Sequence, residues 1–162
     1  MIERQEQYLV IPRVLVFLTR RDKVLLIKGA PAKRNWANLY NGLGGHVERG
    51  ESVMEAAKRE VREESGFHAD HLRLCAVVAV EPSDGDRGIL MFVFRGEAPD
   101  GDAIASSEGE LEWISPNELT GLETVEDLPI LLPIVLDLAP EEDPVWGRYW
   151  YEENGELSTA FG

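Results

Sequence analysis

Three glutamates stand close together in the segment "REVREESG", and their spacing has chemical consequences. Glu60, Glu63 and Glu64 occupy positions i, i+3 and i+4, so in a helix their carboxylates would share one face, where like charges repel. Hard divalent cations such as Mg²⁺ prefer carboxylate oxygens as ligands, and a bound ion would relieve this repulsion. The spacing alone leaves two interpretations open: a metal site, or a glutamate-rich helix face in contact with water.

The helix that must position these carboxylates has clear limits in the sequence. Ser52, followed three residues later by Glu55, matches a capping box, and Gly66 suits the position just after a helix C-terminus. We therefore predict a helix over residues 53–65. At about 100° per residue, the arc predicted to face the core contains Val53, Met54, Ala57 and Val61. The arc predicted to face water contains Glu55, Lys58, Arg59 and Arg62.

A glycine-rich loop leads into this helix. Gly44 and Gly45 allow backbone conformations closed to other residues and let a ligand approach the main chain, where a free carbonyl could supply a further oxygen ligand. Glu51 and Arg59 lie on either side of the helix start, where an ion pair would hold the loop against the helix. The alternatives are an ordinary tight turn and an isolated surface pair.

The remaining segments predict a mixed sheet with helices. Apolar and β-branched runs predict strands at residues 8–20, 23–29, 72–81 and 89–98, the last two as an antiparallel pair. A short strand is expected at "ELEWIS", a helix from about Pro129 with an irregularity at Pro133, and a hairpin with Asn154 and Gly155 at its tip. This order predicts one α/β domain over residues 1–162, with helices packed on the faces of the sheet.

Composition and charge exclude several classes of protein. The 162 residues carry a net charge of −14, from 16 basic and 30 acidic residues, so the positive footprint of a protein that binds nucleic acid polymers is missing. No apolar run approaches the ~20 residues of a membrane span. The first residues have no signal-peptide layout, so we expect a cytoplasmic location and no membrane association. Cys75 is the only cysteine and is expected to be a buried packing residue.

The segment from Gly45 to Phe67 resembles the Nudix box, whose pattern is G-x5-E-x7-R-E-U-x-E-E-x-G-U, with U a bulky aliphatic residue. Gly45 is followed after five residues by Glu51 and after seven more by "REV", and "EESGF" completes the pattern at residues 63–67. Every fixed position matches, and the one departure is the aromatic Phe67 at an aliphatic position. The resemblance implies an α/β/α sandwich with a mixed central sheet and helices on both faces.

The resemblance also implies an activity, the hydrolysis of a nucleoside diphosphate linked to another group. By analogy, Mg²⁺ or Mn²⁺ is held by the Gly45 carbonyl together with Glu60, Glu63 and Glu64. Bound cations would neutralise the phosphate oxygens and acidify the attacking water, and Glu63 or Glu64 would accept its proton. Arg59 and Glu51 would support this catalytic centre. Glu110 and Glu108, in "SSEGELEW", are candidates for an additional ligand or base, or are acidic surface residues.

The residues that flank the box resemble the subgroup of oxidised purine nucleoside triphosphatases. In "WANLYNGLGG", Asn41 matches a position that contacts the base, or it forms a hairpin turn with Gly42. Asp127, or Glu126 next to it, falls where an acidic side chain reads the purine edge. The alternative for Asp127 is an acid at a helix N-terminus that is favoured by the helix dipole. Lys28 is a candidate phosphate contact or a loop residue. His46 departs from the subgroup, which often has Lys at this position.

The expected reaction is therefore Mg²⁺-dependent hydrolysis of a nucleoside triphosphate, such as 8-oxo-dGTP, to a nucleoside monophosphate and pyrophosphate. One alternative is a hydrolase of nucleotide sugars, ADP-ribose or dinucleoside polyphosphates. Another is a domain that binds nucleotides as a sensor without turnover, although such a protein would not need all three glutamates. The expected partner is a small nucleotide rather than a nucleic acid polymer. Because the family often dimerises, a homodimer is an alternative to a monomer.

Overall fold

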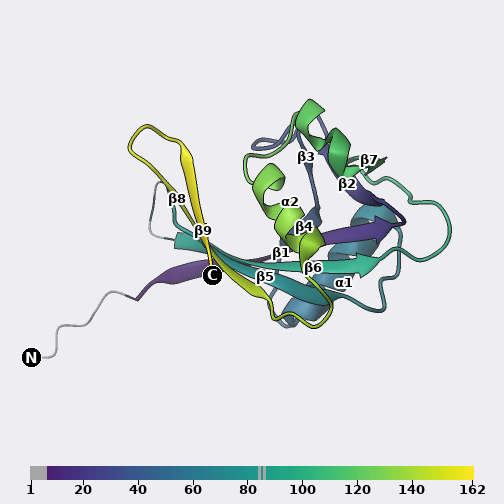
Figure 1. The fold of residues 1–162 in the computed structure, drawn as a ribbon, viewed down its shortest axis with the longest axis horizontal. Coiled ribbons are helices and arrows are strands. Elements are labelled where there is room, and N and C mark those ends of the chain that lie inside the picture. The colour runs from purple at the N-terminus through teal and green to yellow at the C-terminus, as the bar shows by residue number, and fades with distance from the viewer. Residues whose placement is uncertain (1–6, 84, 86) are drawn as a thin grey trace, which may run out of the picture.

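One curved sheet with helices on its two faces forms the framework of the protein (Figure 1). The computed structural model describes residues 7–83, 85 and 87–162. The elements are β1 (Leu9–Arg20), β2 (Lys23–Gly29), β3 (Tyr40–Asn41), β4 (Leu43–His46), α1 (Val53–Ser65), β5 (Arg73–Val80), β6 (Arg87–Glu97), β7 (Gly109–Ile114), η1 (Pro116–Gly121), α2 (Leu128–Asp137), β8 (Val145–Tyr151) and β9 (Leu157–Phe161).

The sheet is mixed, as the sequence predicts. Its main path runs β3-β2-β1-β6-β5-β8-β9, with β4 paired to β1 and β7 paired to β2. The β1–β6 and β5–β8 pairs are parallel, whereas β5 and β6 form the predicted antiparallel pair. The C-terminal hairpin, β8 and β9, therefore extends the same sheet that carries the glycine-rich strand β4.

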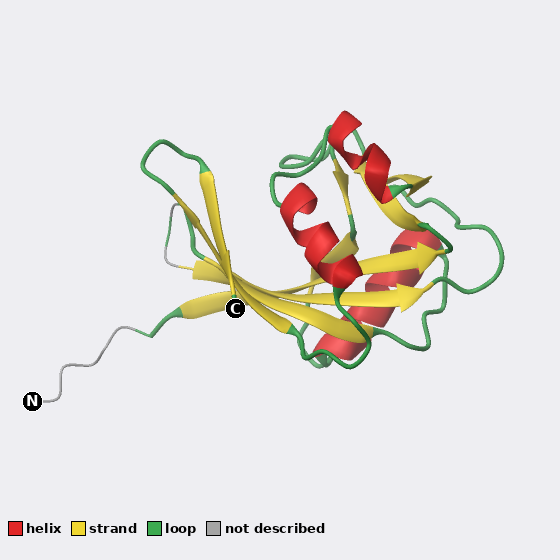
Figure 2. Cartoon of the chain, in the orientation of Figure 1, coloured by secondary structure: helices red, strands yellow, loops and turns green. Residues whose placement is uncertain are grey.

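The two long helices cover opposite faces of the sheet, which confirms the predicted α/β/α arrangement (Figure 2). On one face, Ala56, Ala57 and Val61 of α1 pack into an apolar cluster with residues of β1, β2 and β4. On the other face, α2 buries Leu128, Leu131, Leu132 and Val135 in a second cluster, which also contains the predicted packing residue Cys75. Within the described ranges, no helix is long and apolar enough to cross a membrane.

Helix α1 has the predicted limits but not the predicted buried face. The Ser52 and Glu55 capping box is formed, and Gly66 ends the helix at φ 75° in the left-handed region. Met54, predicted to face the core, is 36% exposed, whereas Ala56 is fully buried. The buried face is rotated because it also includes Glu64 and Ser65, whose contacts with loops and strands are not visible in an apolar periodicity.

The C-terminus of α2 is held by an arginine from the sheet. Pro133 lies inside this helix, and proline cannot donate the backbone hydrogen bond of an ordinary helical residue. Arg95 Nη1 donates to the carbonyls of Val135 and Leu136, both at 2.8 Å. This satisfies terminal carbonyls that have no partner within the helix, and it fixes the end of α2 on the sheet.

Candidate active site

Two glutamates of α1 contact the glycine pair of β4. Glu64 is only 3% exposed, and the Gly44 N–H donates a hydrogen bond to its Oε2 atom at 2.9 Å. A Cβ atom built on Gly45 would lie 2.3 Å from Glu60 Oε1. A side chain at position 45 would therefore displace the Glu60 carboxylate from this place.

Arg59 connects the loop to three carboxylates. Its Nε and Nη2 atoms donate to the two oxygens of Glu51 at 3.0 and 2.7 Å, forming the predicted clamp. Nη2 also donates to the His46 carbonyl at 3.0 Å, and Nη1 donates to Glu60 at 2.9 Å and Glu63 at 3.2 Å. The Arg59 side chain is 19% exposed, so the expectation that it faces water is wrong: the loop folds over it, which helix periodicity cannot indicate.

The electrostatics of the cluster favour a bound cation. Burial raises the pKa of Glu64 to about 8, with the charges of Glu60 and Glu108 acting in the same direction, although the Gly44 N–H and Lys33 oppose the shift. Burial also raises the pKa of Glu60, against the effect of the neighbouring Arg59. A carboxylate that loses hydration beside other acids is stabilised in its charged form by a nearby positive charge. The cluster is thus short of positive charge.

The donors present fit a hard divalent cation. The side chains are carboxylates, which Mg²⁺ and Mn²⁺ bind, and the missing Cβ of Gly45 leaves room beside Glu60. Among the residues that the structure describes, no three acidic, histidine or cysteine side chains surround a single point. Glu60 and Glu63 are turned to Arg59 instead, so binding of an ion requires these side chains to exchange partners.

The structure separates the acidic candidates that follow β6. Glu108 forms an ion pair with Lys33, and its charge raises the pKa of both Glu60 and Glu64. Glu110 is instead an exposed residue of β7, paired in register with Lys28 of β2. Glu108 rather than Glu110 therefore lies in the electrostatic surroundings of the helix carboxylates.

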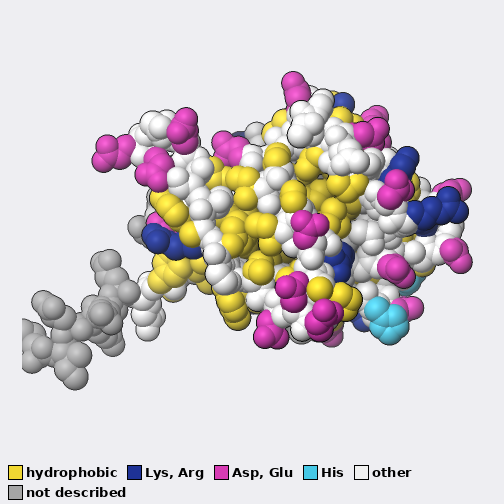
Figure 3. All heavy atoms as spheres, viewed as in Figure 1, with side chains coloured by type: hydrophobic (Ala, Val, Ile, Leu, Met, Phe, Trp, Pro, Cys, Tyr) yellow, Lys and Arg dark blue, Asp and Glu magenta, His cyan; other side chains and the backbone are white. Residues whose placement is uncertain are grey.

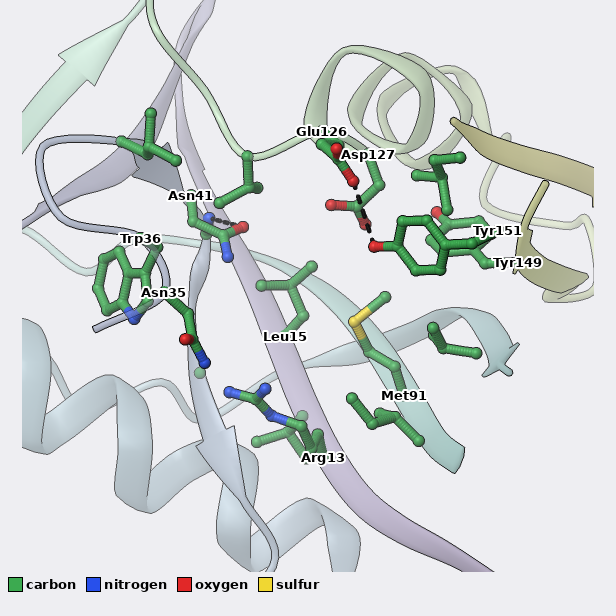
Figure 4. A pocket seen from close by; sticks show the side chains of 18 of the residues that line it. Arg13, Leu15, Asn35, Trp36, Asn41, Met91, Glu126, Asp127, Tyr149 and Tyr151 are labelled. Carbon is green, nitrogen blue, oxygen red and sulfur yellow. Dashed lines mark hydrogen bonds between the residues drawn. The ribbon is translucent and has the colours of Figure 1, made fainter. Parts of the chain in front are cut away.

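A cavity of about 470 Å³ extends from this cluster across the sheet (Figure 4). Its lining includes Gly44 and Glu64 together with Asn41 and Asp127. Its further walls include Arg13, Leu15, Asn35, Trp36, Met91, Glu126, Tyr149 and Tyr151. The volume lies in the range of pockets that bind small molecules. One cavity therefore joins the buried glutamate to the two residues predicted to contact a base.

Not every predicted substrate contact lines this cavity. Asn41 does, and its Oδ1 atom accepts a hydrogen bond from the Gly42 N–H at 2.8 Å. Asp127 also does; it is the N-cap residue of α2, but its side chain makes no capping hydrogen bond. Lys28 does not line the cavity, and its ammonium lies 5.7 Å from the centre of the Tyr40 ring.

Sequence reasoning missed the two tyrosines of β8. Tyr149 and Tyr151 are two residues apart, and side chains at this spacing point to the same face of a strand. Tyr151 donates a hydrogen bond to Glu126 Oε2 at 3.2 Å, and both rings line the cavity. In "RYWYEE" the spacing of the two tyrosines indicates that they share one face of a strand. The sequence does not indicate that this strand, β8, pairs with β5 beside the site.

Comparison with known proteins identifies related sequences. The model of the NUDIX domain matches residues 10–132, a range that contains the carboxylate cluster, Asn41 and Asp127. The oxidized purine nucleoside triphosphate hydrolase of Danio rerio is 28% identical over 122 residues, which cover 75% of this chain and 77% of that protein. The NAD-capped RNA hydrolase NudC of Escherichia coli O157:H7 is 34% identical over 124 residues, covering 75% of this chain and 42% of that protein.

Solved structures show the same fold. The mutator MutT protein of Bacillus halodurans superposes with a TM-score of 0.77 at 24% identity, covering 94% of this chain and 97% of that one. The E. coli ORF135 protein superposes with a TM-score of 0.65 at 30% identity, covering 83% and 96%. These superpositions include most of the chain.

Proposed function

We propose that this chain converts oxidised purine nucleoside triphosphates such as 8-oxo-dGTP to the monophosphate and pyrophosphate. The premise is that the chain belongs to the NUDIX domain family and is a hydrolase acting on nucleotide substrates. The observation that carries this proposal is the single cavity that joins Glu64 to Asn41 and Asp127. A nucleotide bound there would have Asn41 and Asp127 as polar groups for its base and Glu64 as a carboxylate for a phosphate-bound cation.

The metal would be held by the Gly45 carbonyl with Glu60, Glu63 and Glu64. A bound Mg²⁺ or Mn²⁺ supplies charge neutralisation of the phosphate oxygens and lowers the pKa of water. Arg59 ties Glu60 and Glu63 to the loop through Glu51, and on binding an ion these two carboxylates would exchange Arg59 for the ion. Glu63 or Glu64 accepts the proton of the attacking water, and Glu108 adds negative charge that strengthens cation binding.

The base would be read by Asn41 and Asp127. The Asn41 Oδ1 atom is engaged by the Gly42 N–H, which orients the amide so that its NH₂ group can donate to an oxygen or nitrogen of the base. The Asp127 carboxylate accepts from the N–H groups of a guanine-type edge. A polar base edge left without such partners in a buried site is costly, and this provides selectivity.

A second candidate substrate class is supported by another relative. The name of the 34% identical E. coli protein is NAD-capped RNA hydrolase, and NAD contains a pyrophosphate between two nucleosides. The same carboxylates and the same cavity would serve for such a linkage. The second candidate therefore differs from the first in the leaving group, which is a nucleotide rather than pyrophosphate.

A substrate panel tests the proposal. The full chain is incubated with Mg²⁺ and 8-oxo-dGTP, dGTP, ADP-ribose, a nucleotide sugar or NAD, and products are separated by chromatography. We expect the highest kcat/KM for 8-oxo-dGTP, with pyrophosphate released, and a loss of about 10²-fold or more in Glu64→Gln if this carboxylate holds metal or accepts the proton. Higher kcat/KM for NAD or a sugar nucleotide would overturn the substrate, and undiminished turnover by Glu64→Gln would overturn the site. Binding of all these nucleotides without turnover would indicate a sensor.

A further inference from the structure

Tyr149 carries a polar group that the fold alone leaves without a partner. Its side chain is 2% exposed, and its ring packs edge-on against Phe161 with centroids 5.9 Å apart and an interplanar angle of 78°. The hydroxyl is buried and meets no partner in hydrogen-bond geometry among the described residues. Buried hydroxyls are nearly always hydrogen-bonded, and an unmade bond is destabilising. This exception therefore requires an explanation at the cavity that Tyr149 lines.

The Asp127 carboxyl is the acidic group that affects the pKa of this hydroxyl. Burial raises the pKa of Tyr149, and the charge of Asp127 and a hydrogen-bonding contact with its carboxyl raise it further. The two groups therefore already approach each other, although the hydroxyl does not reach full hydrogen-bond geometry. Burial likewise raises the pKa of Asp127, whereas Tyr149 acts to lower it. Figure 4 shows the two side chains on adjoining walls of the cavity, one from β8 and the other from the start of α2. Because Asp127 makes no side-chain capping bond, its carboxyl is able to turn toward either the hydroxyl or a ligand.

We propose that Tyr149 is a positioning residue for Asp127: when a nucleotide is bound, the Tyr149 hydroxyl donates a hydrogen bond to one Asp127 oxygen and leaves the other oxygen to accept from the base. This role rests on the proposed function only in assigning a purine edge to the cavity. The hydrogen bond favours the ionised carboxylate, the form that accepts from the N–H groups of a guanine-type base. Without the hydroxyl, Asp127 binds a proton more readily and discriminates less against an adenine-type edge.

The other polar groups around Asp127 are already engaged or neutral. Glu126 precedes it in the chain and accepts from Tyr151, and its charge acts to raise the pKa of Asp127. From β3, Asn41 is a neutral amide that accepts from a backbone N–H. The two tyrosines of β8 thus face two successive acids: Tyr151 pairs with Glu126, and Tyr149 is left for Asp127.

A double-mutant cycle separates a positioning role from mere packing. The full-length wild type, Tyr149→Phe, Asp127→Asn and the double variant are assayed with Mg²⁺ on 8-oxo-dGTP and dATP. Tyr8→Phe is the matched control, since Tyr8 does not line the cavity and its hydroxyl already has a partner, the Val80 carbonyl. We expect Tyr149→Phe to raise the KM for 8-oxo-dGTP about 10-fold, the size expected for one hydrogen bond to a charged group. We also expect kcat to stay within about twofold, and the preference over dATP to shrink.

Three readouts distinguish the outcomes. In the Asp127→Asn background, Tyr149→Phe should have no further effect on KM. In the ligand-free state Tyr149→Phe should not lower Tm, because the hydroxyl makes no full hydrogen bond there. The rise of KM with decreasing pH should begin at a higher pH in Tyr149→Phe than in the wild type. An equal loss in both backgrounds, or an unchanged KM in Tyr149→Phe, would overturn the positioning role. If the wild type prefers another nucleotide, the proposed function fails, and the cycle is then run on that nucleotide with the same criteria.

Discussion

At the scale of single residues, Gly45 decides how closely the main chain approaches the carboxylates. A Cβ at this position would lie 2.3 Å from Glu60 Oε1 and 2.7 Å from its Cδ atom. Because the colliding atoms are the end of a flexible side chain, Gly45→Ala should fold but displace Glu60. We expect the concentration of Mg²⁺ needed for half-maximal activity to rise about 10–100-fold, the usual effect of disturbing groups that orient metal ligands. A Mg²⁺ titration of turnover, with Tm as a check of folding, measures this.

Gly121→Ala is the matched control for this substitution, since a Cβ there meets no atom within 4 Å. It should leave the Mg²⁺ dependence unchanged. If Gly45→Ala also showed the wild-type Mg²⁺ dependence, the contact with Glu60 would have no part in binding the ion.

Glu51 predicts a specific dependence of stability on pH. The hydrogen bonds from Arg59, with a further one from the Glu48 N–H, lower the pKa of Glu51 from 4.5 to about 2. A carboxyl whose pKa is lower in the folded state stabilises the fold above its unfolded pKa and loses this effect as pH falls. Glu51→Gln should therefore have a lower Tm than the wild type at pH 6, and the difference should close as pH falls from about 4.5 toward 2.

Thermal unfolding in EDTA over this pH range measures the effect, with Glu48→Gln on the same loop as the control. A difference in Tm between Glu51→Gln and the wild type that stays constant down to pH 2 would show that the carboxylate acts by packing rather than by its charge.

The sequence alone predicted the glutamates of the candidate site more readily than its other residues. The clamp between Glu51 and Arg59 is predictable because both belong to one contiguous pattern with fixed spacing. Tyr149 is not, because its place depends on the parallel pairing of β8 with β5, which joins segments far apart in the chain. Glu108 and Glu110 are also indistinguishable in sequence; only the position of β7 beside β2 separates them.

At the scale of elements, α1 is the support on which the carboxylates depend. The Ser52 side chain accepts from the Glu55 N–H, and the Glu55 side chain accepts from the Ser52 N–H. Ser52→Ala should lower the free energy of unfolding by about 1 kcal/mol, the usual value of an N-cap. Urea unfolding measures it. Ser52→Asp retains an N-cap acceptor and should stay close to the wild type; equal losses in both variants would exclude capping as the cause.

Local sequence signals predicted the two ends of this helix better than they predicted which of its faces is buried. Its ends are marked by a capping box and by Gly66, both of which act through neighbours in the chain. The buried face was predicted with Met54 because apolar residues alone defined it. In the structure the buried face includes Glu64, which is held by the Gly44 N–H of another element. A buried carboxylate with a distant partner is invisible to hydrophobic periodicity.

At the scale of the whole molecule, the sheet brings two chemical environments into one cavity. Strands β1, β3 and β4, the start of α2 and the C-terminal hairpin each contribute lining residues. On the face shown in Figure 3, acidic side chains are scattered around a largely apolar centre. With a net charge of −14, the molecule repels an anionic nucleotide at long range, so its association with substrate should depend on cations.

Divalent cations should therefore stabilise the folded protein as well as support turnover. An ion that binds only the folded cluster raises the free energy of unfolding, by about 2.7 kcal/mol at 100 times its Kd. We expect a higher Tm in saturating Mg²⁺ or Mn²⁺ than in EDTA with NaCl at matched ionic strength, where general screening is the same. The increase should shrink in Glu60→Gln and Glu64→Gln, because each replaces a proposed ligand and removes part of the repulsion that the ion would relieve. An equal increase in these variants and the wild type would place the stabilising ion elsewhere on this acidic molecule.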